Sequence, residues 1–510
     1  MTDRGQWKSK MGFILAASGS AIGLGNIVFF SANAYRFGGG AFYLPYFIAL
    51  FLVGIPVMIV EFSLGHMTRR AFPQSMHGVA GRKGEFLGWW AIFNASFISM
   101  YYITILAWVV GMFFGAFGSL WKSAVSVPCF EVDLQNPYAF FFALISSWKT
   151  IACVLFVWML NAFIVRRGAG TIEPAVKVFV PLMWIFMIVL LVRGVTLDNG
   201  GQGVQLLFTP NLEVMKHPDV WQGAFSQIFF SLSLGFGILT AYASYLPRKS
   251  DQVSNAVLTS TLNCGFEYIA GVTIFAILFA FAMVPRASTL SMMFFIVPQG
   301  ISQLPGGSPS VIGFGLMFFL LLFLAGLSSS VSLVEALVSA VVDKFKGGRG
   351  KAILIFSIIG TLGSLCFALP MVIDPAMRGN GTLGLTLLDL VNHWAFDNGL
   401  LVVGLLECIL IGWIFGISRL KDHVNASSRF RLGFVFSWLI KLVIPALIVV
   451  LLTFSIRKEF ADGLFGRHLI PDAGPGWLGA LPLVAFLFWL IGSVGAAAFF
   501  TLRGGYQDES

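Results

Sequence analysis

Two segments of the chain combine small, polar and flexible residues in a way that could bind ions. The first reads AASGSAIGLGN from Ala16 to Asn26, and the second reads SLSLGFG from Ser231 to Gly237. Both lie inside long apolar runs, where a glycine weakens a helix by about 1 kcal/mol relative to alanine. A helix that unwinds there frees backbone carbonyls and amides, which need partners within a membrane. Freed carbonyls, serine hydroxyls and asparagine amides are the oxygen ligands that hard cations prefer.

Patterns for other chemistries are missing from the sequence. It contains no CxxC pair, no HExxH pair and no histidine set with metal spacing, and GGRGK at 347–351 lacks the spacing of a phosphate-binding loop. The five cysteines are scattered, with only Cys129 in a predicted outer loop, so no internal disulfide is expected. We therefore expect neither an enzyme nor an ATP-driven pump.

The composition indicates the elements that must position these segments. Hydrophobic residues make up 57% of the 510 residues and charged residues 11%, against about 45–50% and about 25% in a globular chain. So few charges could not cover a soluble fold. We expect an all-α polytopic membrane protein.

Twelve apolar runs are long enough to cross the hydrocarbon core, which takes about 20 residues. They cover residues 11–36, 41–67, 87–120, 139–165, 172–194, 222–247, 254–284, 310–343, 352–372, 394–418, 432–455 and 475–502. The net charge is +9, and most of the basic residues lie in alternate loops. This distribution follows the positive-inside rule when both termini are cytoplasmic. The predicted location is the plasma membrane, and no nucleic-acid partner is expected.

The two glycine-rich segments fall in the first and sixth runs, five spans apart. Tight helix packing explains one such helix, but a pair at corresponding positions predicts an inverted-repeat transporter with both helices unwound at mid-membrane. This predicts five regions: an N-terminal latch at 1–10, a first repeat at 11–194, an extracellular loop at 195–221, a second repeat at 222–418, and two further helices with a cytoplasmic C-terminus at 419–510.

Four stretches resemble the neurotransmitter:sodium symporter family, and in particular bacterial amino-acid members such as the leucine transporter. They are GSAIGLGN at Gly19–Asn26, GGGAFYLPY at Gly38–Tyr46, QIFFSLSLGFGILTAYASY at Gln227–Tyr245 and AGLSSSVSL at Ala325–Leu333. The resemblance covers the first ten predicted helices almost continuously. Helices 11 and 12 match only in kind.

The resemblance implies two sodium sites. The first would use the Ala21 carbonyl and the substrate carboxylate with the side chains of Asn26, Ser231 and Asn263. The second would use the carbonyls of Gly19, Ile22 and Ala325 with the hydroxyls of Ser328 and Ser329. Ser231 and Ser328 stand where the leucine transporter has threonine, so the ligand oxygen is kept and a methyl group is lost.

The implied substrate follows from position 23. Family members that carry biogenic amines have an aspartate where this chain has Gly23, so a free α-carboxylate is expected to occupy that space instead. The ammonium would bind near Phe230 and Ser233. The residues implied to bind substrate are Ala21, Ile22, Gly23, Leu24, Gly25, Ile98, Tyr102, Phe230, Ser231, Ser233, Phe236, Ser329 and Leu333.

Glu267 is an acid within a membrane span, which is a functional hypothesis by default. Chloride-dependent relatives have serine at the matching position, so the resemblance implies that Glu267 replaces chloride and makes transport chloride-independent. It could also carry a proton back in the empty carrier. The alternative is a structural carboxylate satisfied by neighbouring amides. Glu61 resembles the acid that braces the unwound part of the first helix.

The resemblance implies two gates, and only the cytoplasmic gate keeps the residues of the family. The cytoplasmic latch would comprise Arg4, Trp7, Ser244, Tyr245 and Asp343. The extracellular gate would comprise Phe29, Tyr102, Phe230 and Asn392. Phe29 and Asn392 replace the family's outer Arg and Asp, and losing both avoids a costly unpaired charge.

We therefore expect a symporter that couples two Na⁺ sites, without chloride, to uptake of a neutral, hydrophobic α-amino acid. Helices 1, 2, 6 and 7 would rock against helices 3, 4, 8 and 9. A taurine- or betaine-like zwitterion is an alternative cargo, and an amino-acid sensor or channel without coupling is an alternative function. The expected partners are the amino acid and the lipid bilayer, and a homodimer is left open.

Overall fold

The computed structural model describes residues 6–118, 137–209, 212–286, 288–373, 383–467 and 476–503, and every regular element in these ranges is helical. Among the described residues, nine helices are long and apolar enough to cross a membrane, or eleven when two sharply bent pairs are counted as single spans. The all-α, polytopic membrane fold is confirmed. The count of twelve spans and the inverted repeat stay predictions.

The first predicted span is broken in its middle. α1 (Lys10–Ala21) begins after Ser9, whose hydroxyl accepts the Gly12 N–H, and its regular helix ends at Ala21. Beyond the break, a π-helical turn (Gly25–Phe29) leads into α2 (Phe30–Arg36). The two halves are bent by 59°. The helix therefore stops within the predicted glycine-rich segment.

The second glycine-rich segment also interrupts a helix. α10 (Pro218–Ser231) ends at Ser231, and α11 (Ile238–Ala243) begins only after Gly237. Ser233, Gly235 and Gly237 have φ angles of 57°, 79° and 73°. Because these left-handed conformations do not fit a right-handed helix, the chain unwinds there, and at Ser233 this costs roughly 1–2 kcal/mol. Both predicted unwound segments are confirmed.

Most of the other helices lie close to the predicted runs, but the short helices within 200–208, 289–302 and 383–391 lie outside them, and two of the runs differ in form. The helix expected from residue 87 begins at Phe72 and is kinked at Ala80 and Gly81, which have non-helical angles. The run at 139–165 forms two helices bent by 78° at a short break. The elements are α3 (Tyr43–Ala49), α4 (Ile55–Thr68), α5 (Phe72–Ala116), α6 (Pro137–Ile145), α7 (Lys149–Val165), α8 (Ala169–Val195), α9 (Gly200–Phe208), α12 (Gln252–Ala280), α13 (Thr289–Ser291), α14 (Val297–Ser302), α15 (Gly307–Phe345), α16 (Arg349–Ile373), α17 (Leu383–Val391), α18 (Leu400–Ile409), α19 (Ile417–Asn425), α20 (Phe434–Trp438), α21 (Ile444–Asp462) and α22 (Leu481–Leu502).

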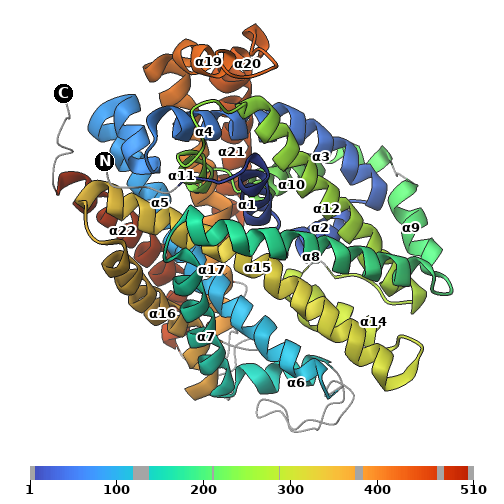
Figure 1. Cartoon of the computed structure of the whole chain (residues 1–510). Helices are drawn as coiled ribbons and strands as arrows, with labels where there is room; N and C mark the ends of the chain where they lie inside the picture. The colour runs from blue at the N-terminus through green and yellow to red at the C-terminus, as the bar shows by residue number, and fades with distance from the viewer. Residues whose placement is uncertain are drawn as a thin grey trace.

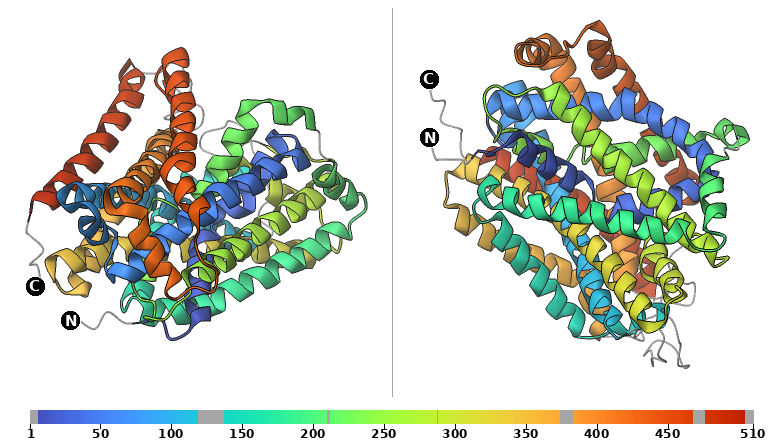
Figure 2. Two further views of the ribbon diagram at one scale, coloured as in Figure 1. Left: turned by 90° about the horizontal axis from the view of Figure 1, so that it is seen from above. Right: turned by 45° about the vertical axis from the view of Figure 1, so that its right-hand side comes forward.

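The long helices α5 and α15 form the centre of the bundle and pack against each other. α15 also packs against α8 and α1, so the first half of the broken first helix lies against α15 (Figure 1). The two C-terminal helices α21 and α22, orange and red in Figure 2, lie at the edge of the bundle. Their apolar side chains are largely exposed, as expected for helices that face lipid.

Candidate ligand-binding site

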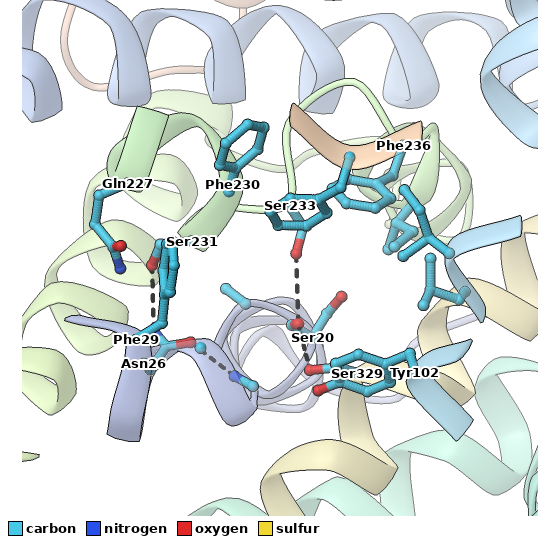
Figure 3. Close-up of a pocket in the computed structure, with 17 residues that line it drawn as sticks. Ser20, Asn26, Phe29, Tyr102, Gln227, Phe230, Ser231, Ser233, Phe236 and Ser329 are labelled. Carbon is cyan, nitrogen blue, oxygen red and sulfur yellow. Dashed lines mark hydrogen bonds between the residues drawn. The ribbon is translucent and has the colours of Figure 1, made fainter. Parts of the chain in front are cut away.

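A cavity of about 100 Å³ lies between the two helix breaks. Side chains from α5, α15 and the π-helical turn Asn392–Gly399 complete its wall (Figure 3). Its lining residues are Ser20, Ala21, Gly23, Gly25, Asn26, Phe29, Ile98, Tyr102, Gln227, Phe230, Ser231, Ser233, Phe236, Ile238, Ser329, Leu333 and Phe396. The cavity is thus built where neither broken helix can satisfy its own backbone.

Most residues predicted to bind substrate line this cavity; Ile22 and Leu24 do not. Ile22 continues the last turn of α1, donating its N–H to the Ser18 carbonyl at 2.7 Å. Leu24 is connected to the site through its backbone, because its N–H donates to the Tyr102 hydroxyl at 3.2 Å. The structure therefore brings the predicted set together, while the binding roles stay predictions.

There is little space around Gly23. A methyl group at this position would lie 2.9 Å from the Tyr102 hydroxyl oxygen and 3.0 Å from Ser329 Oγ. The Ser329 hydroxyl donates to the Ser20 carbonyl at 2.9 Å, and the Ser233 hydroxyl approaches the same carbonyl at 3.4 Å. The Ser20 carbonyl therefore connects the first break to α15 and to the second break. A side chain at position 23 would force this network apart.

A buried cluster of amides and a hydroxyl forms one end of the cavity. Asn26 Nδ2 donates to Asn263 Oδ1 at 2.7 Å and lies 3.2 Å from Ser231 Oγ, and Asn263 Nδ2 donates to Ser231 Oγ at 2.6 Å. Asn26 Oδ1 accepts the Gly23 N–H at 2.8 Å. The predicted side chains of the first sodium site are therefore in mutual contact, and their oxygens are the type of ligand that a hard cation prefers.

The residues predicted for the second sodium site lie where α1 meets α15. A methyl group at Gly19 would lie 3.8 Å from Ser328 Oγ, so the two positions face each other. The Ser328 hydroxyl donates to the Ala325 carbonyl at 3.0 Å. Serines within membrane helices often make such a bond to their own helix, so this contact fits a structural role as well as a binding role.

Glu267 lies on α12, behind the cavity wall. Its carboxylate is fully buried and accepts the Tyr46 hydroxyl and, at 2.8 Å, Gln227 Nε2. Gln227 lines the cavity, and its Oε1 accepts Asn33 Nδ2 at 3.1 Å. Each carboxylate oxygen therefore has a donor. One amide side chain separates the acid from the cavity.

The N-terminal segment closes against the far end of α11. Trp7 is 3% exposed and donates its indole N–H to the Tyr242 carbonyl at 2.8 Å and its backbone N–H to the Tyr245 carbonyl at 3.1 Å. Ser244, also buried, donates its hydroxyl to the Ala241 carbonyl at 2.6 Å. The predicted latch residues Trp7, Ser244 and Tyr245 are therefore adjacent.

Of the other two predicted latch residues, the structure describes Asp343 but not Arg4. Asp343 Oδ2 accepts the Ala71 N–H at 2.7 Å, so it holds the start of α5. Arg4 lies outside the described residues, and the Arg–Asp pair stays a prediction.

Aromatic rings also line the cavity. Phe396 lies with its ring centroid 4.2 Å from that of Phe230 and 6.2 Å from that of Phe236. Phe29 lines the cavity as well. The Asn392 side chain accepts the Tyr101 hydroxyl at 2.8 Å and is not part of the lining. Its predicted role in the outer gate stays a prediction.

Sequence reasoning missed Ser20, Gln227, Ile238 and Phe396 as cavity residues. Gln227 begins the quoted stretch that leads into the second break, and Ser20 lies inside the first, so both were within reach of the pattern. Phe396 follows Asn392 by about one helical turn, but the π-helical geometry of residues 392–399 shifts the register of the side chains.

Glu61 braces a break, although the second one rather than the first. Its Oε1 accepts the Gly235 N–H at 2.8 Å, and its backbone carbonyl lies 3.2 Å from the Thr240 hydroxyl. The sequence-based prediction that this acid supports the first helix is therefore corrected. The acid satisfies an amide that the unwound segment of α10 and α11 leaves free.

Comparisons with known proteins agree over almost the whole chain. A family model described as the sodium:neurotransmitter symporter family matches residues 4–136 and 143–492. An uncharacterized sodium-dependent transporter from Methanocaldococcus jannaschii is 36% identical, with 92% of this chain and 96% of that protein covered. The crystal structure of MhsT in complex with L-phenylalanine has a TM-score of 0.76 and 28% identity, covering 88% of this chain and 99% of that one.

More distant matches are described as chloride-dependent. The human sodium- and chloride-dependent GABA transporter 2 is 29% identical, covering 99% of this chain and 88% of that protein. The rat sodium- and chloride-dependent taurine transporter is 28% identical, covering 93% and 82%.

Proposed function

The chain belongs to the sodium:neurotransmitter symporter family, and on that premise we propose that it carries a neutral, mainly hydrophobic α-amino acid into the cell together with sodium. Its family members and relatives are transporters rather than enzymes. The observation that carries the proposal is the cavity between the two helix breaks, where polar backbone groups lie beside apolar side chains.

The polarity of the broken helices supports an α-amino acid. The half-helix that starts near Gly25 has its N-terminus at the cavity, and helix N-termini favour an anionic group such as a carboxylate. α1 and α10 end at the cavity with their carbonyl ends, which favour cations such as sodium and an ammonium group. An α-amino acid carries both charged groups on a single carbon atom, so a cavity of this size can accommodate both.

The remaining wall supports an apolar side chain. Ile98, Phe236 and Leu333 face the cavity without an ionisable group among them. Gly23 provides no carboxylate to pair with an amine, which disfavours a biogenic amine. The complex of MhsT with L-phenylalanine is consistent with an α-amino acid as the ligand of a related site.

A zwitterion with separated charges is the competing cargo. The matches to GABA and taurine transporters favour it, because those proteins are named for such substrates. A thermal-shift screen of neutral α-amino acids against taurine, betaine and GABA, with and without sodium, separates the two. We expect sodium-dependent stabilisation by α-amino acids only. Stabilisation only by the other zwitterions would assign the cargo to that class.

Sodium coupling is tested by uptake into proteoliposomes. With an imposed inward sodium gradient, the amino acid found in the screen should accumulate above its equilibrium level. When the gradient is replaced by equal sodium on both sides, accumulation should stop while exchange continues. Uptake that only equilibrates under the gradient would instead favour a channel, and binding without any uptake would favour a sensor.

We propose that Glu267 supplies the negative charge that chloride provides in other members, and that its protonation can return a proton outward. The carboxylate contacts Tyr46 and Gln227 and lies behind the Asn26, Ser231 and Asn263 cluster. Glu267→Ser should make uptake depend on external chloride, whereas the wild type should transport equally in chloride and in gluconate. Wild-type uptake that fails in gluconate would contradict this assignment.

Alternating access is proposed to involve rocking of helices 1, 2, 6 and 7 against helices 3, 4, 8 and 9. Here these correspond to α1 with α2, α4, α10 with α11, and α12, which move against α5, α7, α15 and α16. Trp7 and Tyr245 would close the cytoplasmic path, and Phe230 with Phe29 would close the outer path. The integral, multi-pass membrane location is supported by the spans and the family. The plasma membrane, the cytoplasmic termini and a homodimer stay predictions.

A further inference from the structure

A second, larger cavity of about 370 Å³ lies on the outside of the central helix pair. Five helices contribute to it: α5, α7, α15, α16 and α22, which lie together in Figure 1. Its lining residues are Phe93, Ser96, Phe97, Ser99, Met100, Trp158, Val334, Leu337, Val341, Phe345, Ala352, Ile355, Phe356, Ile359, Gly360, Phe499, Phe500 and Arg503. Ile355 and Ile359 are 54% and 50% exposed, so the cavity is open towards the lipid-facing side.

The polar groups inside this cavity already have hydrogen-bond partners in the protein. The Ser96 hydroxyl donates to the Ile92 carbonyl at 2.9 Å, and the Ser99 hydroxyl donates to the Ser96 carbonyl at 2.8 Å. The Trp158 indole donates to Ser364 Oγ at 3.0 Å. Because these polar groups already have partners and the other walls are apolar, the cavity suits hydrocarbon rather than water.

One end of the cavity carries a cation. Arg503 follows α22, is exposed, and its guanidinium lies 4.4 Å from the centroid of the Phe499 ring. Within the described part of the chain, no carboxylate forms an ion pair with it. A guanidinium placed in this way is suited to a phosphate, which it binds with two parallel hydrogen bonds.

The cavity runs along α16, in the direction that a lipid acyl chain would take in the cytoplasmic leaflet. From Ala352 to Gly360 it follows about eight residues of α16, or about 12 Å. Its cationic end lies with Phe345 and Ala352, where the sequence places the cytoplasmic surface, and cytoplasmic leaflets are rich in anionic lipids. We propose that this cavity binds an anionic phospholipid, with its phosphate on Arg503 and one acyl chain along α15 and α16.

This site would lie directly behind the ligand-binding cavity. Leu333 lines the ligand cavity and its neighbour Val334 lines the lipid cavity. On α5, Ile98 faces the ligand cavity, whereas Phe97 and Ser99 face the lipid cavity. An acyl chain there would pack against the rear of the two helices that hold the ligand-facing side chains. The proposal does not depend on which cargo is carried.

The test is retention of lipid by the full-length protein. Protein reconstituted in vesicles of equal phosphatidylglycerol and phosphatidylcholine is extracted and examined by native mass spectrometry. Wild-type protein should retain phosphatidylglycerol in preference to phosphatidylcholine, and Arg503→Gln should retain about fivefold less of it, the effect of one arginine at an anionic leaflet. Arg166→Gln is the matched control, because Arg166 follows α7 and lies 4.2 Å from the Phe163 ring centroid without lining the cavity.

A second variant tests the acyl-chain part. Ile355→Trp fills the mouth of the cavity from an exposed position, so folding is expected to be preserved, and retention of either phospholipid should fall. Equal retention of the two phospholipids by wild-type protein would overturn the proposal and leave a crevice filled by bulk lipid. Equal loss in Arg503→Gln and Arg166→Gln would also overturn it. Lipid retention is read without any uptake measurement, so a failure of the proposed transport function is distinguishable from a failure of the lipid site.

Discussion

The cavity leaves little room for a side chain at Gly23. We predict that Gly23→Ala lowers ligand affinity about tenfold or more, because the added methyl group must displace the Tyr102 and Ser329 hydroxyls and overpacking typically costs about 1–3 kcal/mol. The measurement is ligand-dependent thermal stabilisation in sodium. Gly78→Ala is the control, since a methyl group there has no neighbour within 4 Å. Unchanged affinity in Gly23→Ala would show that the carboxylate does not occupy this space.

Among individual residues, the sequence predicted those whose side chains have a recognisable chemical role, such as supplying oxygen ligands. Asn26, Ser231 and Asn263 were expected from the resemblance, and the structure places them in contact. Phe396 was missed because, in an apolar helix, the sequence does not distinguish an aromatic residue that lines a cavity from one that packs in the core. Its place depends on the π-helical turn at residues 392–399, which shifts the register of the side chains.

The break between α10 and α11 is held by an acid from a neighbouring helix. We predict that Glu61→Ala lowers the free energy of unfolding by about 1–3 kcal/mol, because the buried Gly235 N–H loses its acceptor. Glu61→Gln should be much milder, since the amide oxygen can accept the same hydrogen bond. Both are measured by thermal unfolding. Equal loss in the two variants would mean that the negative charge, and not the acceptor, is what the break needs.

Asp251 caps the start of α12, a helix that carries both Asn263 and Glu267. Burial raises the pKa of Asp251, but hydrogen bonds from Ser254 and the Arg429 N–H outweigh it and lower that pKa from 3.8 to about 2. A depressed pKa in the folded state contributes stability that is present above pH 3.8 and lost as the pH falls towards 2.

We therefore predict that Asp251→Ala destabilises the protein by about 1 kcal/mol at neutral pH and that its difference from wild type shrinks as the pH falls below 3.8. The measurement is the thermal midpoint as a function of pH. Ser288→Ala provides the control, because Ser288 caps α13 with a hydroxyl that does not titrate. A pH-independent difference in Asp251→Ala would argue against a role for its charge.

The existence of the elements followed from the hydrophobic pattern, but some of their ends did not. The predicted runs leave residues 68–86 outside any span, whereas the chain is helical from Phe72 with a break at Ala80 and Gly81. Charged residues at a helix end outside the membrane are solvated either way, so composition alone could not separate the two. Both glycine-rich breaks were predictable, since glycine lowers the cost of the left-handed angles found at Gly235 and Gly237.

For the whole molecule, Trp7 connects the N-terminal segment to the second broken helix. We predict that Trp7→Ala exposes the cytoplasmic path, because the buried ring packs against Tyr242 and Tyr245 and its indole N–H donates to the Tyr242 carbonyl. A cysteine introduced at Ser244 should then react faster with a membrane-impermeant reagent applied from the cytoplasmic side. Trp148→Ala is the control, as that ring is 66% exposed. Equal labelling rates in the two variants would contradict a plug at Trp7.

The overall architecture was the most predictable level, because composition alone excludes a soluble chain. The placement of charge also predicts an orientation, which protease or cysteine accessibility can check. What the sequence could not provide is the relation between distant helices, such as the position of Met100 and Val334 on the rear of the ligand-facing pair. Those contacts depend on how side chains from separate helices pack together.

The two breaks have a consequence for how binding and folding relate in this protein. A helix in a soluble protein ends on a capping side chain that satisfies its free backbone groups. Here α1 and α10 end at a cavity, where side chains satisfy part of the free backbone: the Ser20 carbonyl accepts the Ser329 and Ser233 hydroxyls, and the Gly23 N–H donates to Asn26. We expect whatever enters the cavity to complete or replace these contacts. The cargo and its ions would act as removable caps, and each transport cycle would complete two pieces of secondary structure and then leave them unfinished again.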